Sequence, residues 1–103
     1  MSSPRPAAAE RPRKPEDPAV SVLCLSLRAG AEVGVLARVV QQLARRSLLP
    51  IRLHCTESGA HLLMDLQIAG LGEGEGELLA ESLRQLVGIE EVLTARLLRQ
   101  RAA

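Results

Sequence analysis

Aromatic side chains are missing from this sequence: none of its 103 residues is phenylalanine, tyrosine or tryptophan. Any core must therefore be built from aliphatic side chains, and nucleic-acid binding by stacking of bases on aromatic rings is excluded. A large excess of positive charge is missing as well, since the formal net charge is +1. From these two absences we expect no nucleic-acid partner.

Long apolar runs are also missing. No stretch approaches the roughly 20 apolar residues that a membrane-spanning helix needs, and the N-terminus has no apolar segment typical of a secretion signal. We therefore expect a cytoplasmic protein with no membrane partner. Cysteine is scarce: Cys24 and Cys55 lie within alternating apolar stretches, which predicts two buried, reduced thiols rather than a disulfide.

The rest of the composition is typical of one small folded domain, because 47% of the residues are hydrophobic. Five of the six prolines fall in residues 1–18, where charges of both signs are mixed without periodicity. Such a segment cannot bury enough apolar surface to order itself, so we expect a disordered tail. We place the domain at residues 19–99 and a flexible C-terminus at residues 100–103.

Hydrophobic periodicity divides the domain into six elements. They are a strand at 20–28, a helix at 34–46, strands at 51–56 and 61–69, a helix from about 75 to 87, and a strand at 90–98. The first helix has an apolar stripe of Val35, Leu36, Val39, Val40 and Leu43. This order predicts an α+β, ferredoxin-like βαββαβ sandwich, in which two helices cover one face of an antiparallel four-stranded sheet.

The two middle strands are predicted to form a hairpin with Ser58 and Gly59 in a two-residue turn. That register places Cys55 opposite Leu62, Leu53 opposite Met64 and Ile51 opposite Leu66 on one face. On the other face it places Thr56 opposite His61, His54 opposite Leu63 and Arg52 opposite Asp65. The prediction brings His54 and His61 diagonally close and makes an ion pair of Arg52 and Asp65.

Catalytic and metal-binding patterns are weak. His54 and His61 provide two ligands on one face while Cys55 points to the other, and a structural zinc site needs four. The glycines at 70, 72, 74 and 76 alternate with glutamates that would repel phosphate, so we interpret residues 70–77 as a flexible link. No nucleophile has an activating base on the same face. We expect no catalytic residues, no metal, no cofactor and no enzyme activity.

The entrance to the first helix is more informative. The segment "AGAEVGVL" around Gly34 contains no Ser, Thr, Asp or Asn, although the first amides of a helix usually need such a cap. Gly34 would let a second molecule approach the backbone, and amides at the positive end of a helix suit a carboxylate. The alternative from the residues alone is that Glu32 or water satisfies these amides.

The segments "EVGVLARVVQQLARRSLLPI" and "LRQLVGIEEVLTARLL" resemble the first helix and the last helix and strand of ACT domains. The resemblance implies that the domain pairs through its sheets or helices and binds an amino acid near the first loop and helix entrance. It places the ligand at Gly34, Val35 and Leu36, with Ile51 at the start of the next strand. Three positions depart from the family pattern: Val33 replaces a proline, Ser47 replaces a glycine, and the loop lacks its Asn or Asp.

Within that loop we include Gly30 and Glu32 among the ligand-binding residues, since the carboxylate of Glu32 could hold the amino group in place of the missing Asn or Asp. A short chain of this kind is similar to the small regulatory subunits of acetolactate synthase, which bind a larger catalytic enzyme and respond to branched-chain amino acids. The leading hypothesis is therefore a homodimeric regulatory module that binds an amino acid. The alternative is a ligand-free interaction domain that docks through Val22 and its neighbours on the first strand.

Overall fold

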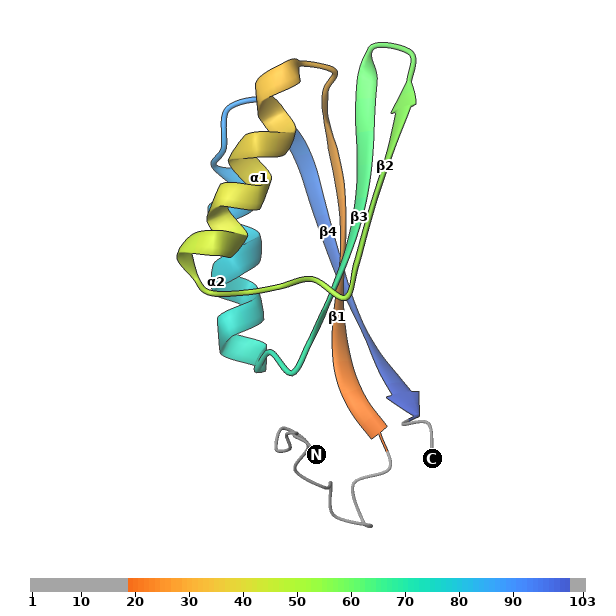
Figure 1. Cartoon of the computed structure of the whole chain (residues 1–103), viewed down its shortest axis with the longest axis vertical. Coiled ribbons are helices and arrows are strands. Elements are labelled where there is room, and N and C mark those ends of the chain that lie inside the picture. The colour runs from red at the N-terminus through yellow and green to blue at the C-terminus, as the bar shows by residue number, and fades with distance from the viewer. Residues whose placement is uncertain (1–18, 101–103) are drawn as a thin grey trace, which may run out of the picture.

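A computed structural model describes residues 19–100, in the order strand, helix, strand, strand, helix, strand. The elements are β1 (Ala19–Gly30), α1 (Val33–Arg45), β2 (Arg52–Ser58), β3 (His61–Ala69), α2 (Glu73–Arg84) and β4 (Ile89–Gln100). The strands form one antiparallel sheet in the order β2-β3-β1-β4, and both helices lie on the same face of it (Figure 1). The predicted ferredoxin-like sandwich is confirmed. The predicted tail, residues 1–18, lies outside the described residues.

The core lies between the helices and the covered face of the sheet. Alternate residues of β1 and β3 supply the sheet side of the core, because successive side chains of a strand point to opposite faces. The buried side chains include Leu23, Leu25, Leu27, Met64, Leu66 and Ile68 from the sheet, and Val35, Val39, Leu43, Leu79 and Leu83 from the helices. Val40 of the predicted stripe is 42% exposed, so the buried stripe of α1 is narrower than the sequence pattern suggested.

The hairpin register differs from the prediction by two residues. Ser58 lies opposite His61 and Cys55 opposite Met64, so the turn consists of Gly59 and Ala60. Gly59 has a φ of 62°, and glycine at the first turn position is typical of a type II′ turn. A shift of two keeps every side chain on its predicted face.

The shift changes which residues meet. Asp65 lies opposite His54 rather than Arg52, and His54 and His61 are no longer diagonal neighbours. The predicted pairing of Arg52 with Asp65 is therefore wrong. Among residues 19–100, no group of three His, Cys, Asp or Glu side chains lies close enough to hold a metal ion.

Both cysteines are free, as expected, but they are not both buried. Every residue of β2 is exposed, including Cys55, because β2 is an edge strand that the helices leave uncovered (Figure 1). Cys24 is half-buried on β1. The strand β3 lies between them, as the predicted topology required.

The glycine and glutamate segment is also different from the prediction. Residues from Glu73 onward are helical rather than a flexible link, and α2 ends at Arg84, before Leu86 and Val87. The Glu75 carboxylate accepts a hydrogen bond of 3.1 Å from the Gly72 amide, which caps the helix start. With 13 and 12 residues, α1 and α2 are each too short to cross a bilayer.

Candidate functional site

The entrance to α1 has no side-chain cap. Glu32 occupies the N-cap position with an extended backbone (φ −120°, ψ 148°), but its carboxylate makes no capping hydrogen bond, and the first turn contains no acidic residue. Instead, Glu32 Oε1 lies 3.8 Å from Nη1 of Arg38, in the second turn of α1. The idea that the Glu32 side chain caps the helix is therefore wrong.

Gly34 makes room for the side chain of Arg38. An added Cβ at Gly34 would lie 3.2 Å from Nη2 of Arg38, because side chains four residues apart stack on one face of a helix and lean toward its N-terminus. The same guanidinium donates a hydrogen bond of 3.0 Å from Nη1 to the Val87 carbonyl oxygen. A cation of the chain itself thus lies at the position where the sequence suggested a ligand.

The turn between α2 and β4 forms the other side of the entrance. Gly88 has a φ of 97°, and its carbonyl oxygen accepts a hydrogen bond of 3.0 Å from the Gly30 amide. On the opposite flank, the Ala31 amide donates a 3.0 Å hydrogen bond to the Ala60 carbonyl oxygen in the β2–β3 turn. The loop that leads into α1 is held from both sides, which fixes its shape without a ligand.

The predicted ligand-binding residues do not all meet at this entrance. Gly30, Glu32 and Gly34 lie together around it, whereas Val35 is fully buried and Leu36 is half-buried against the core. An added Cβ at Gly88 would lie 3.2 Å from Cγ2 of Val35, so Val35 packs beneath that turn.

Ile51 lies far from the entrance. Its amide donates to the Gln67 carbonyl oxygen, and Gln67 lies opposite Cys24 in the middle of β1, whereas the entrance follows Gly30 at the end of β1. Within one copy of the chain, Ile51 therefore cannot contact a ligand held by Gly34.

A shallow hollow of about 290 Å³ opens beside the entrance, lined by Ala31, Glu32, Val33, Glu57 and Leu62. Val33 is 99% exposed, so it offers an apolar contact at the surface. The hollow thus places two carboxylates beside apolar side chains, next to the amides of the first helical turn and the Arg38 guanidinium. An ammonium group suits the carboxylates, and a carboxylate suits the amides and the guanidinium.

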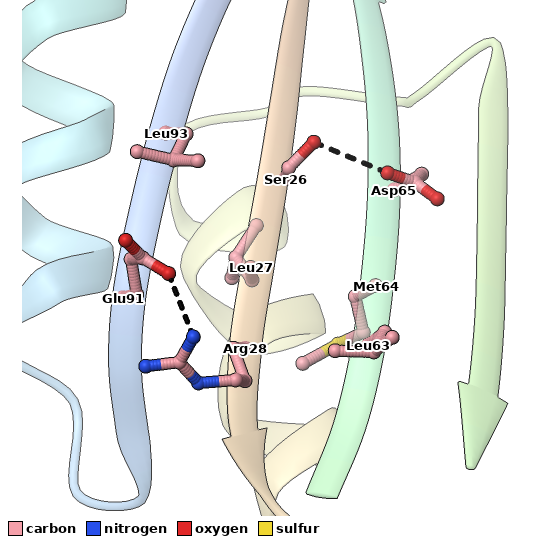
Figure 2. A pocket seen from close by; sticks show the side chains of 8 residues that line it. All are labelled: Ser26, Leu27, Arg28, Leu63, Met64, Asp65, Glu91 and Leu93. Carbon is pink, nitrogen blue, oxygen red and sulfur yellow. Dashed lines mark hydrogen bonds and ion pairs between the residues drawn. The ribbon is translucent and has the colours of Figure 1, made fainter. Parts of the chain in front are cut away.

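A second hollow, of about 220 Å³, lies on the sheet face that no helix covers (Figure 2). Its charged groups are already paired: Arg28 Nη1 lies 2.9 Å from Glu91 Oε1, and Arg28 Nε lies 3.1 Å from Glu90 Oε1. Ser26 Oγ donates a 3.2 Å hydrogen bond to Asp65. These groups would have to exchange partners to bind an ion. Arg38 also has partners at the α1 entrance, but there the first helical turn has no side-chain cap, so the α1 entrance is the better candidate site.

Arg38 is the residue that the sequence interpretation missed. Its position opposite the apolar stripe is typical of a solvent-facing charge, and only its spacing of four from Gly34 could have indicated that the two meet. Its second partner, the Val87 carbonyl oxygen, is distant in sequence and depends on the packing of α2.

Solved structures with the same fold share little sequence with this chain. The ACT domain of GTP pyrophosphokinase from Chlorobium tepidum matches with a TM-score of 0.66 and 10% identity, covering 74% of this chain and 99% of that one. The C-terminal domain of MgtC from Mycobacterium tuberculosis matches with a TM-score of 0.62 and 13% identity, covering 82% and 95%.

A homoserine dehydrogenase from Thiobacillus denitrificans matches with a TM-score of 0.60 and 22% identity, covering 82% of this chain and 19% of that larger one. No curated protein sequence matches significantly. The family model for the ACT-like domain, by contrast, matches residues 19–101. That match covers the whole βαββαβ unit, and the chain therefore belongs to the ACT-like domain family, whose members are generally regulatory, non-catalytic modules.

Proposed function

We propose that this chain is a homodimeric regulatory module that binds a free amino acid at the α1 entrance. The observation that carries the proposal is the arrangement of charge there. Glu32 and Glu57 border a hollow that adjoins the first turn of α1, while Arg38 lies over that same turn. An α-amino acid carries one ammonium and one carboxylate on the same carbon, so it matches two charges of opposite sign at close range.

The apolar side chains that line the hollow indicate which amino acids would bind there. Val33 and Leu62 line the hollow together with its two glutamates. An aliphatic amino acid could place its side chain against these two residues and bury apolar surface. Branched-chain amino acids meet this requirement. In its more specific form, the proposal is that the chain acts as a small regulatory subunit of acetolactate synthase.

The regulated enzyme would be a separate, larger protein. ACT-like domains are generally regulatory, and one structural neighbour is the ACT domain of a GTP pyrophosphokinase. The chain itself would then supply binding and a change in shape or assembly, rather than chemistry. A cytoplasmic location remains the prediction from the sequence.

The test is thermal unfolding followed by far-ultraviolet circular dichroism, with each amino acid added in turn at millimolar concentration. A ligand at about 100 times its dissociation constant adds roughly 2.7 kcal/mol to the free energy of unfolding, which raises the midpoint by on the order of 10 °C in a domain of this size. We expect such a shift with an aliphatic amino acid. No shift with any amino acid would refute the proposed ligand.

Gly34→Asp tests the location of the site, because its carboxylate would lie beside Arg38 and the first amides of α1. The variant should lose the ligand-induced shift while keeping its fold. Gly74→Asp is the matched control, since Gly74 lies in the first turn of α2 with open space around it. An equal ligand-induced shift in wild type and Gly34→Asp would mean that the ligand binds elsewhere, and an equal loss in Gly34→Asp and Gly74→Asp would refute a loss specific to the α1 entrance.

A ligand-free interaction domain is the second candidate function. It is favoured by the position of Arg38, whose side chain donates to the Val87 carbonyl oxygen and occupies part of the entrance. Exposed leucines on the sheet favour it as well. Val22 is a poor probe of that surface, because it is fully buried although it lies on the uncovered face. Val22→Lys would unfold the domain rather than report on docking.

A further inference from the structure

The corner where α1 leads into β2 exposes aliphatic side chains. Leu49, Ile51 and Leu53 are 86%, 46% and 42% exposed. Leu53 lies opposite Leu66 and shares the sheet face that the helices cover, but β2 is the edge strand that they leave uncovered (Figure 1). Single exposed leucines are common on protein surfaces, whereas three aliphatic residues within five positions form a patch. We call residues 45–53 the α1–β2 corner.

A helix-ending motif fixes the start of the corner. The Ser47 amide donates a 3.0 Å hydrogen bond to the Ala44 carbonyl oxygen, and Ser47 has a φ of 56°. The Leu48 amide donates a 2.9 Å hydrogen bond to the Leu43 carbonyl oxygen. Together these bonds form a Schellman motif, in which the residue after the left-handed position usually makes a hydrophobic contact with the helix. Leu48 packs against the core, so both bonds and packing anchor the turn.

The rest of the corner is also held in place. The Ile51 amide donates to the Gln67 carbonyl oxygen of β3 at 2.8 Å. On the other side, Nη2 of Arg46 donates to Oγ of Ser82 in α2 at 3.1 Å. Leu49, the most exposed side chain of the patch, lies between these fixed points. Binding of a partner here therefore requires little further ordering of this chain.

The corner is also positively charged. No acidic residue occurs from position 33 to position 56, whereas this stretch carries Arg38, Arg45, Arg46 and Arg52. Arg38 lies near Glu32, but the other three arginines form no salt bridge with any residue from 19 to 98. The end of the helix dipole explains a basic residue at Arg45 or Arg46, but Arg52 lies on a strand. Basic side chains around an apolar patch suit a partner that is both acidic and aliphatic.

Other occupants fit this surface less well. A two-fold contact places the same patch of two copies together, so a second copy would bring the arginines of one corner against those of the other. A lipid surface usually meets aromatic side chains at the membrane interface, and this sequence has none. A protein segment with carboxylates and aliphatic side chains matches both the charge and the apolar surface.

We propose that the α1–β2 corner docks an acidic, aliphatic segment of a partner protein. Leu49 is the apolar anchor, and Arg45 and Arg52 pair with carboxylates on either side of it. The corner follows the C-terminal end of α1, whereas the amino-acid site lies at the N-terminal end. The partner and the amino acid therefore do not compete for the same surface. The inference rests on the proposed function only where the partner is taken to be the regulated enzyme.

A labelled peptide tests the apolar anchor. The probe is a fluorescein-labelled amphipathic peptide of about 14 residues, built from glutamate and leucine at helical spacing. Its fluorescence anisotropy should rise on titration with wild type. Leu49→Asp should weaken binding about tenfold or more, because an unpaired carboxylate would be buried against leucine. Leu78→Asp is the matched control at an exposed leucine of α2 and should bind as wild type does.

Charge reversal tests the acidic character of the partner. Arg45→Glu should weaken binding of the glutamate peptide and strengthen binding of the same peptide with lysine in place of glutamate. Ser58→Glu, at the far end of β2, is the control and should change neither affinity by as much. Equal effects of Arg45→Glu and Ser58→Glu would overturn the assignment of charge to the corner.

Three results would overturn the docking surface itself. They are no peptide binding by wild type, unaltered binding by folded Leu49→Asp, and sedimentation of wild type with phosphatidylserine vesicles in place of peptide binding. If Leu49→Asp loses its circular dichroism spectrum, Leu49→Ala replaces it and should still weaken binding through the lost apolar contact. Amino-acid binding is measured separately by thermal unfolding, so a failure here leaves the proposed ligand site standing.

Discussion

Arg38 and Val87 connect the first helix to the turn that precedes the last strand, through a 3.0 Å hydrogen bond from the guanidinium to the carbonyl oxygen. The bond exists because Gly34 offers no side chain where the guanidinium lies and because Gly88 turns the backbone with a positive φ. A ligand carboxylate at the α1 entrance would compete with Val87 for this cation. Ligand binding could thereby loosen or shift the start of β4.

Arg38→Met should lower the free energy of unfolding by about 1 kcal/mol, because the Val87 carbonyl loses its donor while the apolar stem of the side chain is kept. In a domain of this size the midpoint of thermal unfolding should fall by about 4–8 °C. Gln41→Met, at an exposed position of the same helix, is the control and should leave the midpoint nearly unchanged. An equal midpoint in wild type and Arg38→Met would show that the bond has no net effect on stability.

Replacing either of two glycines in α2 with alanine should change the free energy of unfolding, in opposite directions at the two positions. Gly74→Ala should raise the free energy of unfolding by up to about 1 kcal/mol, because alanine is the better helix former and nothing lies within 4 Å of the new Cβ. Gly76→Ala should lower it, because the new Cβ would lie 2.8 Å from Nη2 of Arg96 and 3.3 Å from Cδ2 of Leu23. Chemical denaturation measures both. Stabilisation by Gly76→Ala would mean that α2 does not pack so closely on the sheet.

Gly88→Ala should be more damaging than Gly70→Ala. Both glycines have a positive φ, 97° and 79°, which costs an alanine roughly 1–2 kcal/mol. Only at Gly88 does the added methyl also meet a buried neighbour, Cγ2 of Val35 at 3.2 Å, and Nη1 of Arg38 at 3.5 Å. The difference in urea midpoint between the two variants isolates that contact. Equal midpoints would contradict the packing described for Val35.

Much of this architecture could be predicted because it depends on local patterns. The order of elements, the side chains on each face of the sheet and the buried stripe of Val35, Val39 and Leu43 all follow from periodicity. The hairpin register was wrong by two residues because a shift of two preserves every face. Only the turn preference of Gly59 could have decided between the registers.

The site was harder to predict than the fold. Gly34 and the missing cap of α1 were visible in the sequence, whereas the position of the Arg38 guanidinium depends on the turn at Val87 and Gly88. Ile51 is adjacent to the site only in the family pattern and lies elsewhere in this chain. The glutamates at the start of α2 looked like a linker because glycines alternate with them, yet the hydrogen bond from the Gly72 amide to Glu75 caps a helix.

Cys55 should react slowly with alkylating agents. Partial desolvation, followed by the negative charge of Asp65, raises the pKa of the Cys55 thiol above its ordinary value. In a Cys24→Ser variant at pH 8, iodoacetamide should therefore modify the folded chain more slowly than the urea-unfolded chain. Asp65→Asn should speed the reaction. A faster reaction in the folded chain would contradict the direction of the shift.

The raised pKa of Cys55 also determines how the free energy of unfolding changes with pH. Because the pKa of Cys55 is higher in the folded chain than in the unfolded chain, its contribution is fully present below the ordinary thiol pKa of about 8.5 and is lost as the pH rises through the folded value. The free energy of unfolding should therefore fall slightly more above pH 9 in the Cys24→Ser variant than in a variant that also carries Cys55→Ser. The effect is small because Cys55 is exposed. An opposite order of the two variants would be inconsistent with the raised pKa.

Binding of an amino acid at the α1 entrance can be tested by the thermal midpoint of wild type and Gly34→Asp, each measured with and without each amino acid. We expect a rise on the order of 10 °C for wild type with at least one aliphatic amino acid at saturation, and no rise for Gly34→Asp. A rise of equal size in both proteins, or no rise in wild type with any amino acid, would contradict it.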